Sequence, residues 1–285
     1  MRFPGWFLVR GRRRSFVGFA ESGLRFGYQA WRSQLDSILL ARAQQAGVKV
    51  VHASSRTVVR VTNGRVVGLR IGDEEWSCRY LIDASGTKRW LSRKIGLHVQ
   101  PLSARLVAAY GYLWGGNRFG NIPEFHEHAS GWTWLARVRA DCCQCVRLAV
   151  AKGAGFPALP ASFRNLTRLR GADVTWRVVR EAAGPGYFLC GDAAATLDPS
   201  ASSGVARALM TGIKAVDFVA DVAAHGISEP DATAAYREWV RETIAAQALQ
   251  LAGRYAELKR PPEWLDALPE RLRELGCGKK SLESP

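Results

Sequence analysis

The residues best suited to chemistry lie in a short glycine- and aspartate-containing segment in the second half of the chain. Gly191 and Asp192 follow the apolar run 187–190, and a helix-like pattern begins at Gly204. A carboxylate at the end of a strand can accept hydrogen bonds from ribitol or ribose hydroxyls. A helix N-terminus presents free N–H groups and the positive end of its dipole to an anion. The segment therefore predicts a site for a ligand that carries a sugar and a diphosphate.

With its flanking residues, this segment resembles the second FAD-binding motif of the superfamily that contains flavin monooxygenases, tryptophan halogenases and geranylgeranyl reductases. The resemblance implies that Asp192, together with Gly191, contacts the ribityl and diphosphate region of FAD. Asp192 has an alternative role as a turn or helix cap, but the glycine-containing helix start downstream favours FAD. The residues that the resemblance places near the isoalloxazine ring are Pro199, Ser203, Gly204 and Val205.

Two earlier stretches match the same superfamily in order and spacing. Arg32 lies where the family has a helix arginine that reaches the FAD, although it also fits a solvated helix residue. Asp83, Ser85 and Gly86 match the strand-end element that closes over the adenosine half of FAD. A capping aspartate is an equally good interpretation of Asp83. We therefore expect these residues to contribute to the cofactor site.

Trp132 and Trp134 resemble the Trp-x-Trp strand that lies near the substrate in this family. Alternate residues of a strand point to one face, so the pair also fits a core or an interface. Both are candidate substrate contacts, and no catalytic residue is assigned. The six cysteines have no paired cluster at zinc spacing, which predicts reduced, mostly buried thiols in a cytoplasmic protein and no metal site.

The signature that normally opens this family has no counterpart in the sequence. It consists of a strand, a G-x-G-x-x-G turn and a helix that together cradle the FAD diphosphate. Gly18, Gly23 and Gly27 do not have its spacing. A truncated gene product, a wrongly assigned start or completion by a partner polypeptide would each explain the difference. We expect the chain alone to bind FAD weakly and to be poorly soluble.

Helices and short strands must position these residues. Apolar periodicity predicts a helix at 31–47, followed by a strand at 48–51. Asn63 and Gly64 predict a hairpin turn between two strands, and a third strand is expected at 76–82. Aromatic and β-branched alternation predicts a larger sheet between residues 106 and 151. Short strands are expected at 176–180 and 187–190, and helices at 205–224, 234–258 and 264–275.

These elements predict an α/β (α+β) fold with three parts. The first is an incomplete glutathione-reductase-like FAD-binding domain at 1–105 and 180–225. The second is an antiparallel-sheet substrate domain at 106–179. The third consists of C-terminal helices at 226–285. In the predicted helix at 205–224, apolar residues recur at Leu209, Ile213, Val216 and Val219.

The composition bounds the partners. Hydrophobic residues make up 47% of the chain, but no apolar run is long enough for a membrane span. The formal net charge is +15, which nucleic acid could attract. Because the 40 Lys and Arg residues are spread along the chain, scattered surface charge is favoured over a specific nucleic-acid site.

The resemblance implies an FAD-dependent oxidoreductase. We expect a monooxygenase that acts on an aromatic small molecule or a protein-bound aromatic group, with NAD(P)H or a flavin reductase as the electron source. A catalytically incompetent fragment or a partner-binding subunit of a flavoprotein is the alternative. A flavin-dependent halogenase is the lesser alternative for two reasons. Ala201 stands where tryptophan halogenases carry a glutamate, and 135–137 depart from their Trp-x-Trp-x-Ile-Pro signature.

Overall fold

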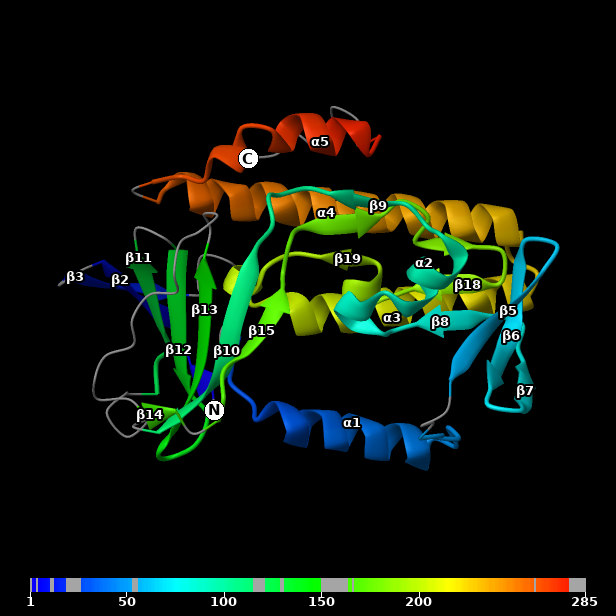
Figure 1. Ribbon diagram of the computed structural model, residues 1–285, viewed down its shortest axis with the longest axis horizontal. Helices are drawn as coiled ribbons and strands as arrows, with labels where there is room; N and C mark the ends of the chain where they lie inside the picture. The colour runs from blue at the N-terminus through cyan, green and yellow to red at the C-terminus, as the bar shows by residue number, and fades with distance from the viewer. Residues whose placement is uncertain are drawn as a thin grey trace. The chain divides into compact units, whose positions relative to one another are not determined.

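The chain folds into mixed helix and sheet, as the sequence predicts, in the computed structural model shown in Figure 1. Its two compact units are residues 1–52 with 106–173, and residues 53–105 with 174–285. The domain boundaries expected from the sequence remain a proposal. The structure describes residues 2–3, 5–10, 13–18, 27–52, 56–114, 121–128, 131–149, 164–165, 167–258 and 260–276.

The first unit is built on one mainly antiparallel sheet, which confirms the larger sheet expected after residue 106. Its strands have the order β14-β10-β13-β12-β11-β2-β3, and β15 also pairs with β10. Among the described strands of this sheet, only β2 and β11 pair in parallel. Inward side chains, including those of Leu113 and Leu135, are buried in its core. The strands are β2 (Gly5–Arg10), β3 (Arg13–Gly18), β10 (Val107–Trp114), β11 (Glu124–His128), β12 (Gly131–Arg137), β13 (Cys142–Ala149), β14 (Arg164–Asn165) and β15 (Arg170–Asp173). A separate pair joins β1 (Arg2–Phe3) and β4 (Gly27–Tyr28).

Helix α1 (Arg32–Gln45) follows Trp31 in the first unit. The Trp31 ring stacks on Tyr112 with centroids 4.3 Å apart, and the Arg139 guanidinium lies 4.2 Å from the ring centroid. The strand expected at 48–51 is absent, and Val48 and Val51 are exposed. β-branched residues favour a strand when a neighbour pairs with them, and no described strand does so here.

The second unit begins with the predicted hairpin. β5 (Thr57–Thr62) and β6 (Arg65–Ile71) flank Asn63 and Gly64, whose φ values of 49° and 74° confirm the turn. The single strand expected at 76–82 is instead two strands in different sheets. β7 (Glu74–Ser77) pairs with β6, whereas β8 (Leu81–Asp83) pairs with β18 (Tyr187–Leu189). The backbone N–H of Cys78 still bonds to Val67, so the chain leaves the hairpin sheet just after that residue.

Two small sheets and several short helices form the centre of the second unit. One sheet has the order β17-β18-β8, with β17 at Ala183–Gly184. The other is β19 (Ala195–Thr196), β16 (Arg177–Val179) and β9 (Val99–Pro101). The short helices are η2 (Gly86–Lys88), α2 (Trp90–Ile95), η4 (Gly191–Ala193), η5 (Pro199–Ala201) and η6 (Glu263–Leu265).

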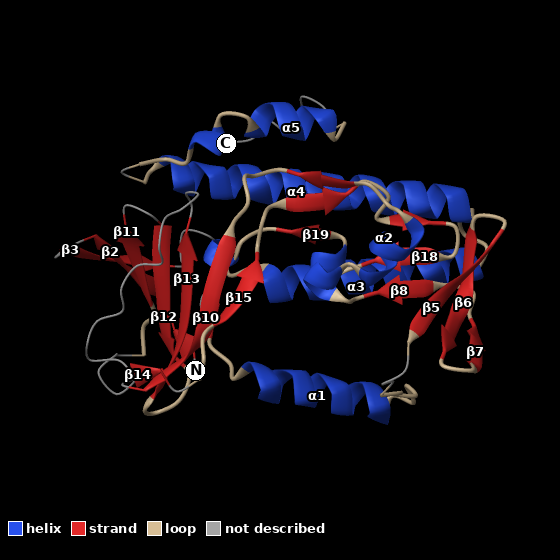
Figure 2. Ribbon diagram, in the orientation of Figure 1, coloured by secondary structure: helices blue, strands red, loops and turns tan. Residues whose placement is uncertain are grey.

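Three longer helices complete the second unit, close to the predicted ranges. They are α3 (Gly204–Ala223), α4 (Glu229–Ala256) and α5 (Leu268–Glu274), and α3 and α4 lie side by side (Figure 2). Across the described part of the chain, no helix combines the length and apolar character that crossing a membrane requires.

The apolar stripe on α3 faces outward. Leu209, Ile213 and Val216 are 49%, 62% and 54% exposed. An apolar stripe normally turns toward the core, but here the buried positions are Arg207, Thr211 and Ala215. The two polar members of that buried face form hydrogen bonds with η4, which orients the helix this way.

Candidate functional site

Two predicted motifs lie next to each other because β8 and β18 are parallel neighbours. Asp83 at the end of β8 is in register with Leu189 at the end of β18, and the Cys190 N–H donates to the Asp83 carbonyl over 3.0 Å. Short helices η2 and η4, which follow the two strands, therefore pack together. The carboxyl edge of parallel strands is the usual place for a ligand in α/β sheets.

Asp192 lies against the first turns of α3. Its Oδ1 accepts a hydrogen bond from Nη2 of Arg207 over 3.2 Å; the arginine side chain is 3% exposed and the aspartate side chain 40% exposed. The preceding Gly191 has a φ of 57°, and its N–H donates to Thr211 Oγ1 over 2.8 Å. The carboxylate is thus fixed on one side and accessible on the other.

The start of α3 keeps its backbone donors available. Ser203 occupies the N-cap position without a side-chain hydrogen bond, and Ser202 before it is left-handed with a φ of 52°. Pro199, Gly204 and Val205 are exposed around this start. An uncapped N-terminus of a long helix attracts negative charge. The residues expected near the flavin ring therefore form an accessible surface beside Asp192.

Asp83 has the capping arrangement that the sequence left open. It is 5% exposed, with Oδ1 accepting from the Ser85 N–H over 2.8 Å and Oδ2 from the Leu91 N–H over 2.9 Å. The Ser85 hydroxyl in turn accepts from the Trp90 N–H over 2.8 Å. Gly86 has a φ of 66°, which suits glycine. This network shapes the turn after β8, and a cofactor contact by these residues stays a prediction.

The remaining predicted contacts belong to the first unit. Arg32 is 63% exposed and pairs with Asp36 over 2.7 Å on α1. Trp132 is buried, Trp134 is half-buried, and both rings contact Phe125 at centroid distances of 5.2 Å and 6.5 Å. Burial places Trp132 in the core of its unit, and a substrate contact by either tryptophan stays a prediction.

Sequence reasoning missed Arg207 and the residues that hold it. Its Nη1 donates to Gln247 Oε1 of α4 over 3.3 Å, while its buried Nε has no hydrogen-bond partner in the described structure. The available signal was modest: Arg207 is the only charged residue between Pro199 and Ile213. Burying a charged side chain costs free energy unless partners compensate it. A single arginine in an otherwise uncharged helix start is therefore a candidate for a specific interaction.

Most of the described cysteines are buried. Burial raises the pKa of Cys143 to about 12 and that of Cys145 to about 11, which keeps both protonated at neutral pH. Cys142 and Cys190 are also buried, and Cys277 lies outside the described residues. Among the described residues, His, Cys, Asp and Glu form no cluster suited to a metal ion.

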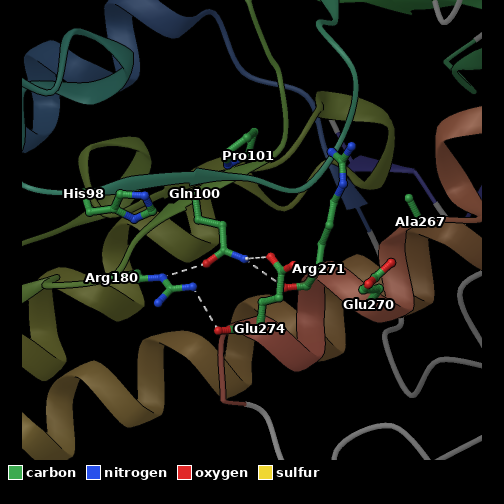
Figure 3. Close-up of a pocket in the computed structure, with 8 residues that line it drawn as sticks. All are labelled: His98, Gln100, Pro101, Arg180, Ala267, Glu270, Arg271 and Glu274. Atoms are coloured by element: carbon green, nitrogen blue, oxygen red, sulfur yellow. Dashed lines mark hydrogen bonds between the residues drawn. The ribbon is translucent and has the colours of Figure 1, made fainter.

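A cavity of about 600 Å³ lies elsewhere in the second unit, between β9 and α5 (Figure 3). Gln100 crosses it: its Nε2 donates to the Arg271 carbonyl over 3.0 Å and to Glu274 over 3.1 Å. Its Oε1 accepts from Arg180 Nε over 2.8 Å. Because these hydrogen bonds join β9 to α5, we interpret the polar groups in this cavity as structural contacts between the two elements.

Comparison with known proteins identifies the family of the chain. The family model described as tryptophan halogenase matches residues 12–260. A 1H-pyrrole-2-carbonyl-[peptidyl-carrier protein] brominase of Pseudoalteromonas luteoviolacea (strain 2ta16) is 26% identical over 260 residues, covering 78% of this chain and 63% of the relative. A tryptophan 2-halogenase of Chondromyces crocatus is 26% identical over 280 residues, covering 81% of this chain and 51% of the relative. The chain thus spans between half and two thirds of the length of these relatives.

Solved flavin-dependent halogenases have the same fold. The halogenase CmlS aligns with 99% of this chain and 58% of its own, with a TM-score of 0.74 and 21% identity. The myxobacterial chondrochloren halogenase CndH aligns with 100% of this chain and 76% of its own, with a TM-score of 0.77 and 20% identity.

Proposed function

The chain belongs to the tryptophan halogenase family, and on that premise we propose that it acts in an FAD-dependent halogenase whose substrate is an electron-rich aromatic ring. This corrects the order in which the sequence ranked the oxidoreductase activities, because halogenation was the lesser alternative to hydroxylation. Ala201 and residues 135–137 depart from the halogenase signatures, but the family match extends over most of the chain and outweighs them.

One observation carries the cofactor assignment. The half-exposed Asp192 carboxylate lies 3.2 Å from Arg207, which is in the first turn of α3. A carboxylate with one anchored oxygen can accept a ribityl hydroxyl on the other. The N–H groups at the start of α3 favour the negative charge of a reduced flavin ring. These residues fit the ribityl and ring half of FAD.

The chain's own residues would bind and orient, while the cofactor supplies the oxidising chemistry. When bound and reduced, FAD provides, with O₂, the two-electron oxidation that attaching a halide to an aromatic carbon requires. Asp192 would accept the ribityl hydroxyl, and Pro199, Ser203, Gly204 and Val205 would border the ring. Arg32, Asp83, Ser85 and Gly86 stay proposed contacts for the rest of the cofactor.

The relatives' names support a proposal for the substrate class. One relative is a brominase of a carrier-bound pyrrole and another a halogenase of tryptophan. We propose a pyrrole- or indole-type ring, free or carrier-bound, with a flavin reductase that draws electrons from NAD(P)H. Trp134, half-buried on β12, is the candidate aromatic contact.

The activity is tested by incubating the purified protein with FAD, a flavin reductase, NADH, bromide and either tryptophan or a pyrrole-2-carboxyl substrate. Mass spectrometry should detect a brominated product. A product that gains oxygen instead would support the monooxygenase alternative and contradict the proposal. FAD uptake without any product would favour the second candidate, a partner-binding flavoprotein subunit, for which the exposed apolar face of α3 is the supporting observation.

A further inference from the structure

Asp198 is a buried carboxylate that three described donors satisfy. It is 3% exposed, and its Oδ1 accepts from the Ser200 N–H over 2.9 Å. Its Oδ2 accepts from Trp176 Nε1 over 2.7 Å and from the Tyr255 hydroxyl over 2.9 Å. Among the described residues, no Lys, Arg or His forms a salt bridge with it. A buried carboxylate is costly unless it is fully hydrogen-bonded, so these three donors are what make its position possible.

Two of the donors to Asp198, Trp176 and Tyr255, belong to an aromatic cluster that also contains Trp264. The Trp176 ring centroid lies 5.9 Å from that of Tyr255 and 4.9 Å from that of Trp264. The backbone of Trp176 is itself held in place. Its backbone N–H donates to Ser103 Oγ over 3.0 Å, and its backbone carbonyl accepts from the Leu102 N–H over 2.7 Å. A satisfied polar network in such surroundings rigidifies the segment that it joins.

The segment joined here is the loop that leads into α3. Asp198 caps η5 and directly precedes the exposed Pro199. Ser203 ends the loop as the N-cap residue, and Gly204 begins α3. Helix α4 provides the support, because Tyr255 lies near its C-terminal end. Burial raises the pKa of Asp198, whereas the hydrogen bonds from Ser200, Trp176 and Tyr255 oppose that rise and favour the charged form.

We propose that Asp198 is a positioning residue: it fixes the loop 198–203 against Trp176 and α4, and thereby sets where the loop and the first turn of α3 meet the flavin ring. The inference rests on the proposed function. In this proposal Asp198 acts without contacting FAD itself. Helix α4 contributes to the cofactor site indirectly, through the hydrogen bond from Tyr255 to Asp198.

Hydrogen exchange measured by mass spectrometry on the cofactor-free protein tests the loop directly. Asp198→Asn cannot satisfy all three donors, since its amide replaces an acceptor by a donor. Exchange at the amides of residues 200–204 should rise about tenfold or more, as expected for loss of hydrogen bonds to a charged group. Tyr255→Phe, which removes one donor and keeps the ring, should give a smaller rise of about fivefold.

Leu272→Ala is the matched control, because Leu272 is fully buried in α5 of the same unit and touches none of these hydrogen bonds. It should lower overall stability without a selective change in the loop. Loop exchange in Asp198→Asn and Tyr255→Phe no faster than in Leu272→Ala would overturn the inference.

The visible absorption spectrum of bound FAD separates positioning from a merely structural role. In Asp198→Asn the flavin bands should shift or lose fine structure and affinity should fall, whereas Leu272→Ala should keep the wild-type spectrum. A wild-type spectrum and affinity in Asp198→Asn, despite a loosened loop, would refute the positioning role. Failure of the wild-type protein to take up FAD would refute the proposed function instead, and the exchange measurement alone would then judge the loop.

Discussion

A single ion pair organises the candidate site at the scale of residues. Arg207 is buried and reaches Asp192 and Gln247 from one guanidinium, while the Asp192 side chain stays 40% exposed. Removing a charge from water costs several kcal/mol unless the partners compensate it. Since Arg207 has a buried Nε without a partner, its interactions hold Asp192 in place at some expense to stability.

Arg207→Met should therefore separate binding from folding. Methionine has a similar length and removes the buried charge. Because the Asp192 side chain that it leaves unpaired is 40% exposed and can be solvated, the free energy of unfolding should fall by no more than about 1 kcal/mol. Asp192 would lose its anchor, and FAD should bind about tenfold more weakly, which corresponds to about 1.4 kcal/mol. Fluorescence titration with FAD and urea unfolding measure the two effects. Arg254→Met on the exposed side of α4 is the control, and wild-type affinity in Arg207→Met would count against the anchor.

The local sequence indicated some of these residues and concealed others. Asp192 and Gly204 stand in a motif whose spacing is visible along the chain. Arg207 and Asp198 acquire their partners from α4, at separations of 40 and 57 residues. A pattern of neighbouring residues cannot reveal such pairs, because only the packing of α4 brings them together.

At the scale of elements, prediction succeeded where the signal is local. The Asn63-Gly64 turn requires positive φ at both residues, and both have it. It failed where pairing is distant: the valines at 48 and 51 have no strand beside them, and residues 76–82 divide between two sheets. The stripe on α3 is apolar at helical spacing, yet tertiary hydrogen bonds turn its polar positions inward.

The turn between β17 and β18 shows what one glycine contributes. Gly186 has a φ of 76°, and a Cβ there would lie 2.1 Å from the Val66 carbonyl oxygen. Gly186→Ala should lower the free energy of unfolding by about 2–4 kcal/mol, from the left-handed backbone and the forced shift. Gly212→Ala in α3, where the Cβ meets nothing within 4 Å, should be neutral or stabilising by about 0.5–1 kcal/mol. Equal stability of the two variants, measured by urea unfolding, would contradict this close approach of the turn to Val66.

Two surface properties stand out for the whole molecule, a net charge of +15 and an exposed apolar face on α3. Charge opposes association and exposed apolar area promotes it. The exposed apolar face of α3 gives a physical reason to expect poor solubility. The sequence led to the same expectation by a different argument, the missing glycine-rich signature.

Replacing Ile213 and Val216 together with Gln should reduce self-association without loss of stability. Both side chains are more than half exposed, so the change in unfolding free energy should stay within about 1 kcal/mol. Light scattering against protein concentration measures the association. Ala215→Gln, at a fully buried position of the same helix, should instead unfold the protein. Unchanged scattering in the double variant would show that another surface drives association.

The most direct measurement is the affinity for FAD of the wild-type protein, of Asp192→Ala and of Asp217→Ala, an exposed control on α3. Equilibrium titration followed by flavin fluorescence should show weak binding by the wild type. The affinity should be unchanged in Asp217→Ala and at least about tenfold weaker in Asp192→Ala, as expected when a charged hydrogen-bond acceptor is lost. Equal affinity in Asp192→Ala and the wild type, or no wild-type binding at all, would contradict a flavin site at Asp192.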